Sequence, residues 1–251
     1  MDKAIVLDAG GKKVSSTSAE KARKMLRDGK AALVSEAPLT IRLSYAVSLP
    51  SAPEPEEAEP LPGAGKRILL HICCGPCSTH TINRLRELGF AVTGFWYNPN
   101  IHPFAEHEKR RETVAEYAGR VGLPMIWNPG YDMPLYFREV AGHEKFGERC
   151  RLCYRLRLAQ TASAAREGGF DAFTTTLLIS IHQDQAAIRA IGDEMSAEQG
   201  VLFFYEDFRR GWSERGRIAN ECGLYKQRYC GCLYSEWEAA VSTTKTPRHE
   251  E

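Results

Sequence analysis

Short runs of apolar residues alternate with longer amphipathic stretches through most of the chain. The apolar runs predict buried strands at residues 67–72, 91–96, 125–127, 171–174 and 201–205, and the stretches between them predict helices at 79–88, 105–121, 151–167 and 183–198. Strands that alternate with helices usually pair in parallel. We therefore expect an α/β fold with a doubly wound parallel sheet, in which ligands bind beyond the carboxyl ends of the strands.

A smaller pattern precedes this one. It predicts strands at residues 4–7, 31–34 and 40–43 and a helix at 18–27 that Gly29 ends. Residues 49–64 contain four glutamates and five prolines, a composition that cannot form a core and favours an extended linker. We expect four parts, namely a small basic α+β module at 1–48, an acidic linker at 49–64, a large domain at 65–237 and a flexible tail at 238–251.

The charge of the chain is balanced as a whole but unevenly distributed. The formal net charge is +1, whereas residues 1–48 carry nine Lys and Arg against five Asp and Glu. The basic helix of this module favours either nucleic-acid contact or a solvated surface. No stretch of eighteen apolar residues and no N-terminal signal pattern is present in the sequence. We therefore expect a cytoplasmic protein without a membrane segment.

The eight cysteines are clustered rather than scattered. They occur as Cys73-Cys74 with Cys77, as Cys150-x-x-Cys153, as Cys222, and as Cys230-Gly231-Cys232. A thiol that only fills space in a core has no reason to lie beside other thiols. In a cytoplasmic protein, clustered cysteines are more often metal ligands or catalysts than disulfides. The pattern indicates metal and redox chemistry, with Cys222 alone interpreted as a buried structural thiol.

Two of these groups are candidates for one metal site. Cys73 and Cys74 follow a predicted strand, while Cys150 and Cys153 lie near the N-terminus of a predicted helix, whose dipole favours the thiolate form. Four thiolates can enclose a 4Fe-4S cluster or a tetrahedral zinc ion. Because the side chains of adjacent cysteines diverge, they are poorly placed to chelate one zinc ion, and the pattern favours the cluster.

The cysteine pair near the C-terminus has a different character. The spacing of Cys230 and Cys232 is too short for a zinc knuckle, and the intervening glycine permits the strained turn that a disulfide bond between near neighbours needs. We interpret the two as a redox-active pair, with two surface thiols as the alternative. Gln227 precedes the pair beside two basic residues, and we interpret it as a contact to substrate or tRNA.

Polar residues also follow the strand predicted at 91–96. Asn98 and His102 can bind hydroxyl groups or supply a proton, and Tyr97 can stack on a flipped base. A simple turn explains the same residues. Arg110, on the helix that follows, is interpreted as part of a solvated face or as a phosphate contact.

Four segments of the chain resemble the epoxyqueuosine reductases of the QueH type. They are His71–Ser78, Phe95–Pro103, Arg149–Leu158 and Tyr225–Ser235, and the similarity covers residues 66–237. The resemblance implies a fold of the HUP or PP-loop-like kind. It also implies an oxidoreductase that reduces epoxyqueuosine to queuosine in the anticodon loop of tRNA.

The same resemblance assigns roles to the cysteines. It implies a redox-active pair at Cys230 and Cys232, and a 4Fe-4S cluster held by four ligands, Cys73, Cys74, Cys150 and Cys153. Some members of the family have Asp where Cys77 stands, so Cys77 is interpreted as a catalytic residue or as a ligand of a second metal ion, such as iron, beside the cluster. The partners implied are tRNA and an electron donor that the sequence does not identify.

The N-terminal module resembles the RRXRR-type domain found ahead of some RNA-guided and HNH-type endonucleases. The resemblance rests on residues 6–9, 21–26, 29–31 and 39–43. It fails at residues 14–17, where the family has a Pro-Leu-Met-Pro-like turn, and no nuclease motif follows. The module is therefore expected to bind nucleic acid or to be a solvated basic surface.

Two other classes of function compete with the reductase. A sulfur-transfer or nucleotide-activating enzyme of the PP-loop type needs a Ser-Gly-Gly-x-Asp-Ser phosphate loop, but residues 73–77 replace that loop here, which argues against ATP use. A noncatalytic, zinc-dependent RNA-binding protein would use the same cysteines as structural ligands. Iron in the purified protein separates the reductase from this second class.

Overall fold

The computed structural model describes residues 3–45 and 61–244, and the chain divides into two compact units between Glu59 and Pro60. The linker predicted at 49–64 falls mostly outside the described residues, as do residues 245–251 of the predicted tail. Every helix within the described ranges is too short or too polar to span a lipid bilayer.

The first unit is a four-stranded sheet with one helix. The strand order is β2-β1-β4-β3, and the elements are β1 (Lys3–Leu7), β2 (Lys13–Ser18), α1 (Ala19–Arg27), β3 (Ala31–Glu36) and β4 (Leu39–Leu43). The Ser18 side chain caps α1 by accepting a hydrogen bond from the backbone N–H of Lys21. The sequence does not predict β2, because its Ser and Thr residues lack the apolar alternation that signals a strand.

The second unit contains a five-stranded sheet in which every pair of neighbours is parallel. Its order is β7-β6-β5-β8-β9, and the strands are β5 (Arg67–His71), β6 (Ala91–Trp96), β7 (Met125–Trp127), β8 (Ala172–Thr175) and β9 (Leu202–Phe203). The predicted doubly wound parallel sheet is confirmed. Strands β5 and β8 are the most buried, as expected for central strands that are covered on both faces.

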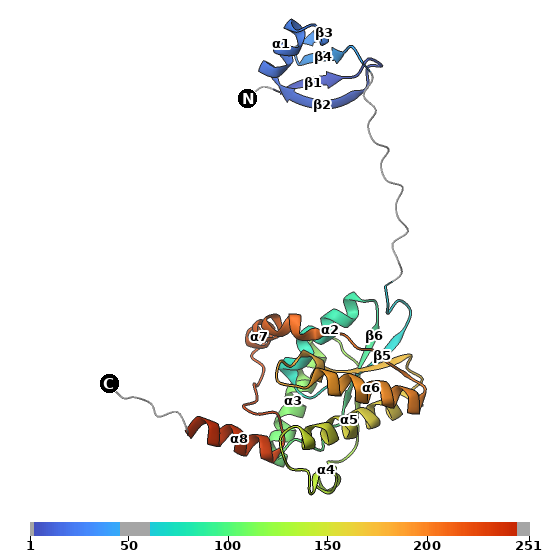
Figure 1. Ribbon diagram of the computed structural model, residues 1–251, viewed down its shortest axis with the longest axis vertical. Helices are drawn as coiled ribbons and strands as arrows, with labels where there is room; N and C mark the ends of the chain where they lie inside the picture. The colour runs from blue at the N-terminus through green and yellow to red at the C-terminus, as the bar shows by residue number, and fades with distance from the viewer. Residues whose placement is uncertain (1–2, 46–60, 245–251) are drawn as a thin grey trace, which may run out of the picture. The chain divides into compact units, whose positions relative to one another are not determined.

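Helices connect these strands or follow the last of them, and they cover both faces of the sheet (Figure 1). They are α2 (Gly75–Glu87), α3 (Phe104–Arg120), α4 (Met133–Val140), α5 (Glu148–Glu167), α6 (Gln185–Gln199), α7 (Trp212–Glu221) and α8 (Leu233–Thr244). Helix α2 packs against α3 and α7, whereas α5 packs against α4 and α6. Short 3-10 helices follow β8 at Thr176–Ile179 and precede α7 at Phe208–Gly211.

The helices differ from the predicted pattern in three respects. Helix α2 begins at Gly75 rather than at residue 79, because Pro76 is already suited to the first turn of a helix. Helix α4 is not predicted by the sequence. Helix α8 continues to Thr244, so the predicted domain boundary at residue 237 falls inside a helix.

The order of the strands determines where the site lies. From β5 the chain builds the sheet outward through β6 and β7, then returns to the other side of β5 with β8 and β9. The direction of winding therefore switches between β5 and β8, and in sheets of this kind ligands bind beyond the carboxyl ends of the strands at that position. Cys73 and Cys74 lie two and three residues after the end of β5.

Candidate metal and redox site

Three thiols meet where β5 passes into α2. The Sγ atoms of Cys73, Cys74 and Cys77 all lie within 4.8 Å of one another, and we call these residues the thiol triad. Cys74 is the N-cap residue of α2 and Cys77 lies in its first turn. The backbone N–H of Cys73 donates to the hydroxyl of Thr176 at 3.1 Å, and this hydroxyl donates to the Cys73 sulfur at 3.3 Å. The loop after β5 is thereby tied to the turn after β8.

The triad favours one thiolate. Hydrogen bonds from the Cys74 and Cys77 thiols hold the pKa of Cys73 well below its ordinary value. The same interactions, together with burial, raise the pKa of Cys74 to about 12 and also raise that of Cys77. A thiolate is the form of cysteine that binds metals and acts as a nucleophile.

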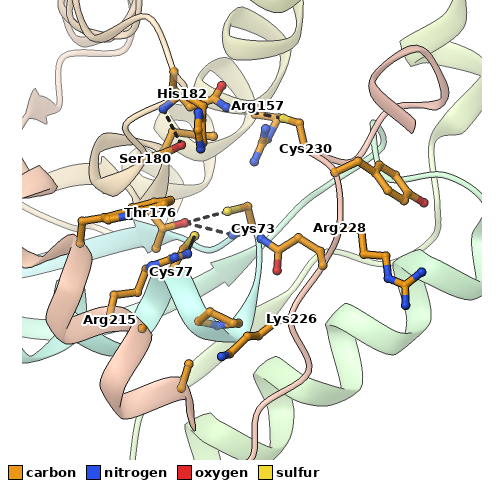
Figure 2. A pocket seen from close by; sticks show the side chains of 18 residues that line it. Cys73, Cys77, Arg157, Thr176, Ser180, His182, Arg215, Lys226, Arg228 and Cys230 are labelled. Carbon is orange, nitrogen blue, oxygen red and sulfur yellow. Dashed lines mark hydrogen bonds between the residues drawn. The ribbon is translucent and has the colours of Figure 1, made fainter. Parts of the chain in front are cut away.

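A cavity of about 410 Å³ opens beside the triad. Its walls come from the loop after β5, the turn after β8, helices α5 and α7, and the segment 226–230. Figure 2 shows Arg157 and Cys230 at one end of the cavity, and Cys73 and Cys77 nearer to Arg215. Thiols from distant parts of the sequence therefore face one space at the predicted edge of the sheet.

A buried cation lies beside these thiols. Arg157, on α5, is 2% exposed, and no carboxylate among the described residues pairs with it. Its Nη1 donates to Cys153 Sγ at 3.7 Å, its Nε donates to His71 Nε2 at 3.4 Å, and its Nη2 has no partner. Burial lowers the pKa of His71 to about 3, so His71 is neutral and adds no charge.

The thiols around Arg157 are suited to bind a metal centre. A buried cation is costly unless negative charge lies close to it, and the groups that interact electrostatically with Arg157 are the thiols of Cys153, Cys73 and Cys230. Soft thiolate ligands select zinc or iron-sulfur clusters. Thiols beside an incompletely paired arginine are therefore suited to an anionic metal-thiolate centre, either a zinc site or an iron-sulfur cluster.

The remaining two predicted ligands lie on α5. Cys150 and Cys153 fall in its first two turns, but their sulfur atoms are not within the 4.8 Å group that the triad forms. Burial raises the pKa of Cys153 to about 12 and also raises that of Cys150. The expected lowering of these pKa values by the helix dipole is thus outweighed by burial. The four-ligand set remains a prediction.

The pair near the C-terminus is divided between the cavity and the core. Cys230 lines the cavity, where Gln183 Nε2 lies 3.6 Å from its sulfur. Cys232 is buried and packs with Tyr136 and Cys153. All eight cysteines of the chain are free thiols, so the structure contains no disulfide bond between Cys230 and Cys232.

Comparison with known proteins decides the family. The family model for epoxyqueuosine reductase QueH matches residues 68–238. This chain belongs to the QueH family. The epoxyqueuosine reductase QueH of Dehalococcoides mccartyi is 40% identical over 172 residues, which cover 68% of this chain and 93% of the relative. The corresponding protein of Thermotoga maritima is 37% identical over 175 residues, covering 67% and 89%. The chain is therefore an oxidoreductase.

Two further comparisons concern the N-terminus and the fold. The family model for RRXRR protein matches residues 4–59. Among solved structures, the U34-tRNA thiolase NcsA from Methanococcus maripaludis, with its 4Fe-4S cluster, aligns over 72% of this chain and 66% of its own. Its TM-score is 0.47 and its identity is 13%, which is too remote to inform the chemistry of this QueH member.

Of the predicted substrate contacts in this QueH member, only Gln227 lines the cavity. Its Nε2 donates to Cys74 Sγ at 3.1 Å. Tyr97 and Asn98 line a smaller pocket, and Asn98 Nδ2 donates to the carbonyl of Ile72 at 2.9 Å, so Asn98 fastens the end of β5. His102 is buried among Tyr131, Tyr136 and Phe137, and burial lowers its pKa to about 4.

The structure adds contacts that sequence reasoning missed. Arg215 Nη1 lies 3.7 Å from Cys77 Sγ, and its guanidinium stacks 3.7 Å above the ring of Trp212. Both residues line the cavity, on a helix that is far in sequence from Cys77 and the rest of the thiol triad. Nothing in their spacing signals this role. Arg110 is 1% exposed and bonded within the protein, so the prediction that it belongs to a solvated helix face is wrong, and its side chain is not available to a phosphate.

Proposed function

We propose that this protein reduces epoxyqueuosine to queuosine in the anticodon loop of tRNA. The observation that best supports the proposal is the convergence of thiols from the segments 73–77, 150–153 and 230–232 around one buried arginine at the switch point of the sheet. The relatives of this chain are named epoxyqueuosine reductase QueH, which agrees with this reaction. A tRNA substrate also agrees with an enzyme of the cytoplasm.

The reaction is a two-electron reduction. The epoxide oxygen leaves as water, a carbon–carbon double bond forms in its place, and two electrons and two protons are consumed. A dithiol that is oxidised to a disulfide gives up two electrons and two protons, so Cys230 and Cys232 can supply both. An external electron donor must then reduce the pair again.

The metal ligands belong to the same proposal. Cys73, Cys74, Cys150 and Cys153 would hold a 4Fe-4S cluster, and Cys77, the third member of the thiol triad, would be a catalytic residue or a ligand of a second iron ion. Such a cluster transfers single electrons at a potential set by the charges and hydrogen bonds around it. Arg157 lies beside Cys73 and Cys153 and favours the anionic forms of these two thiols.

The cavity is suited to one nucleoside rather than to a folded loop. Its volume of about 410 Å³ falls within the range of roughly 300–1,000 Å³ that is usual for small-molecule sites. The target base must therefore leave the stack of the anticodon loop to enter. The basic residues Lys226, Arg228 and Arg215 line the cavity and provide cations for the flanking phosphates.

Anaerobic purification and one assay test the proposal. The protein should carry iron and sulfide, absorb broadly near ~400 nm as such clusters do, and convert epoxyqueuosine in tRNA to queuosine when a reductant is supplied. Digestion of the tRNA and mass spectrometry of its nucleosides measure the product. A colourless protein that holds zinc and leaves epoxyqueuosine intact would instead be the zinc-dependent RNA-binding protein.

A further inference from the structure

One buried arginine fastens the segment that carries Cys230. Arg110, on α3, donates from Nη1 to the carbonyl oxygen of Cys230 at 2.8 Å and from Nη2 to that of Tyr229 at 3.1 Å. Its side chain is 1% exposed, so water does not compete for these contacts. Two adjacent carbonyls held by one planar group fix both the position and the direction of the backbone.

The guanidinium is itself held in place by a carboxylate. Arg110 Nε donates to Glu106 Oε1 at 2.7 Å, one helical turn earlier on α3, and the hydroxyl of Tyr225 donates to Glu106 Oε2 at 2.7 Å. The charge of Arg110 is thereby neutralised within the protein, as a buried cation requires. Tyr225 lies five residues before Cys230, so the network holds both ends of the approach to the thiol.

A second set of contacts holds the same segment from the loop after β6. The backbone N–H of His102 donates to the carbonyl of Gly231 at 2.8 Å, and the hydroxyl of Tyr229 donates to the carbonyl of His102. Gly231 has φ of +152°, and a Cβ atom there would lie 3.2 Å from Asn100 Nδ2. Because Gly231 lies so close to Asn100, the backbone around Gly231 has little room to move.

We propose that Arg110 is a positioning residue for the redox pair. By fixing the carbonyls of Tyr229 and Cys230, it holds the Cys230 thiol at the cavity and keeps the Cys232 thiol in its buried place. This role rests on the proposed function, because it assigns Arg110 to the same reduction of epoxyqueuosine. Arg110 does not touch the substrate, and its effect passes through the backbone of the pair.

Thiol labelling of the full-length holoprotein tests this role directly. Arg110→Gln and Arg110→Lys are compared with wild type and with Arg111→Gln, whose parent arginine is on the same helix but is partly exposed and paired with Glu108. Each protein is treated anaerobically with iodoacetamide, and peptide mass spectrometry gives the rate at which Cys232 and Cys222 are alkylated. Cys222 serves as the internal control because it lies outside this network. Conversion of epoxyqueuosine is measured in parallel.

We expect Cys232 to be labelled about tenfold faster in Arg110→Gln, the factor that the loss of one charged hydrogen bond gives. Arg110→Lys should not rescue it, because an ammonium group cannot replace the planar fork. Cys222 should be labelled at the wild-type rate in both Arg110 variants. In Arg111→Gln, Cys232 and Cys222 should both be labelled at the wild-type rate. Conversion should fall in both Arg110 variants through kcat rather than KM.

Several outcomes overturn the proposal. The proposal is wrong if Cys232 in a folded Arg110→Gln protein is labelled at the wild-type rate. It is also wrong if the labelling rate of Cys222 rises by the same factor as that of Cys232, because the whole domain would then have loosened. If neither Arg110 variant folds, Tyr225→Phe decides, because it removes only a hydroxyl from the network. If Cys232 in this variant is labelled faster than in wild type, by a smaller factor than expected for Arg110→Gln, the role is supported. If its labelling rate does not change, the role is rejected. A further outcome separates the two proposals. If Cys232 is labelled faster in a correctly folded Arg110 variant, but even the wild-type protein does not convert epoxyqueuosine, the positioning role is supported and the reductase function is rejected.

Discussion

The balance of charge around Arg157 is the main residue-scale feature of the site. A cation that is almost fully buried is stable only beside negative charge, and the thiols of Cys73, Cys153 and Cys230 are its electrostatic neighbours. The arginine therefore links the thiol triad to the cysteines of α5 and to the redox pair. Its place in the chain, four residues after Cys153, puts it one helical turn further along the same face of α5.

Replacement of Arg157 should weaken metal binding. We expect Arg157→Leu to lose iron to a chelator roughly 10- to 100-fold more readily than wild type, the usual cost of removing a group that supports metal ligands. The matched control is Arg155→Leu, since Arg155 lies on the same helix but is exposed and paired with Glu194. Iron released by both variants at the wild-type rate would show that the buried charge does not support the metal.

Single cysteine replacements should separate ligands from the redox pair. Cys73→Ala, Cys74→Ala, Cys150→Ala and Cys153→Ala should each lose most of the iron and the activity, because a missing thiolate is not easily replaced. Cys230→Ser and Cys232→Ser should keep most of the cluster absorbance but fail to convert epoxyqueuosine. Iron stoichiometry measured for each variant tests the assignment. Unchanged iron removes a residue from the ligand set, and full turnover by either serine variant makes the pair dispensable.

At the scale of elements, the sequence predicts the larger unit well because its strands are short buried runs separated by amphipathic helices. The residue ranges of β6 and β7 match the prediction. Cys73 and Cys74 could be placed at the sheet edge for the same reason. The contacts of Trp212 and Arg215 could not be predicted, since they depend on how α7 packs against α2, and the sequence contains no signal of that packing.

The early start of α2 brings it into close contact with α3. A Cβ atom added at Gly75 would lie 2.8 Å from Thr113 Cγ2, which is too close for either atom to stay in place. We expect Gly75→Ala to lower the free energy of unfolding by about 1–3 kcal/mol, the usual cost of overpacking. The four tryptophans of the chain all lie after residue 95, so tryptophan fluorescence during denaturation reports on the second unit alone.

A second substitution provides the control for this clash. Thr113→Ser removes the methyl group but keeps the hydroxyl that donates to the carbonyl of Lys109 at 2.8 Å. The double variant Gly75→Ala, Thr113→Ser should therefore recover most of the lost stability. If the two changes are additive, the clash is not the cause of the destabilisation.

The whole molecule combines the reductase unit with a small basic module. Five of the module's exposed basic residues lie on and just after α1, at Lys21, Arg23, Lys24, Arg27 and Lys30. Residues 1–48 have a surplus of four positive charges, and residues 49–64 form an acidic, proline-rich segment in the sequence. We propose that the module adds phosphate contacts to a tRNA that the reductase unit already holds, and that the segment acts as a tether.

Removal of the module tests this role. A shortened chain should begin at Pro60, because Gly63 already contacts the second unit through a hydrogen bond from its N–H to the carbonyl of Leu88. We expect this chain to retain its iron and its chemistry but to bind tRNA more weakly. The slope of log K against log salt should become shallower by roughly 3, the change expected when about four basic residues of the module no longer contact phosphates.

A full-length variant separates charge from tethering. Lys21→Gln, Lys24→Gln and Arg27→Gln together remove three exposed cations from α1 and leave the rest of the chain unchanged. If the module acts through these charges, the triple variant should reproduce most of the change in slope that the shortened chain shows, since each lost phosphate contact lowers the slope by a similar amount. Equal affinity and equal slope for wild type, triple variant and shortened chain would reject tRNA as the partner of the module, and the match to RRXRR protein would then indicate a different one.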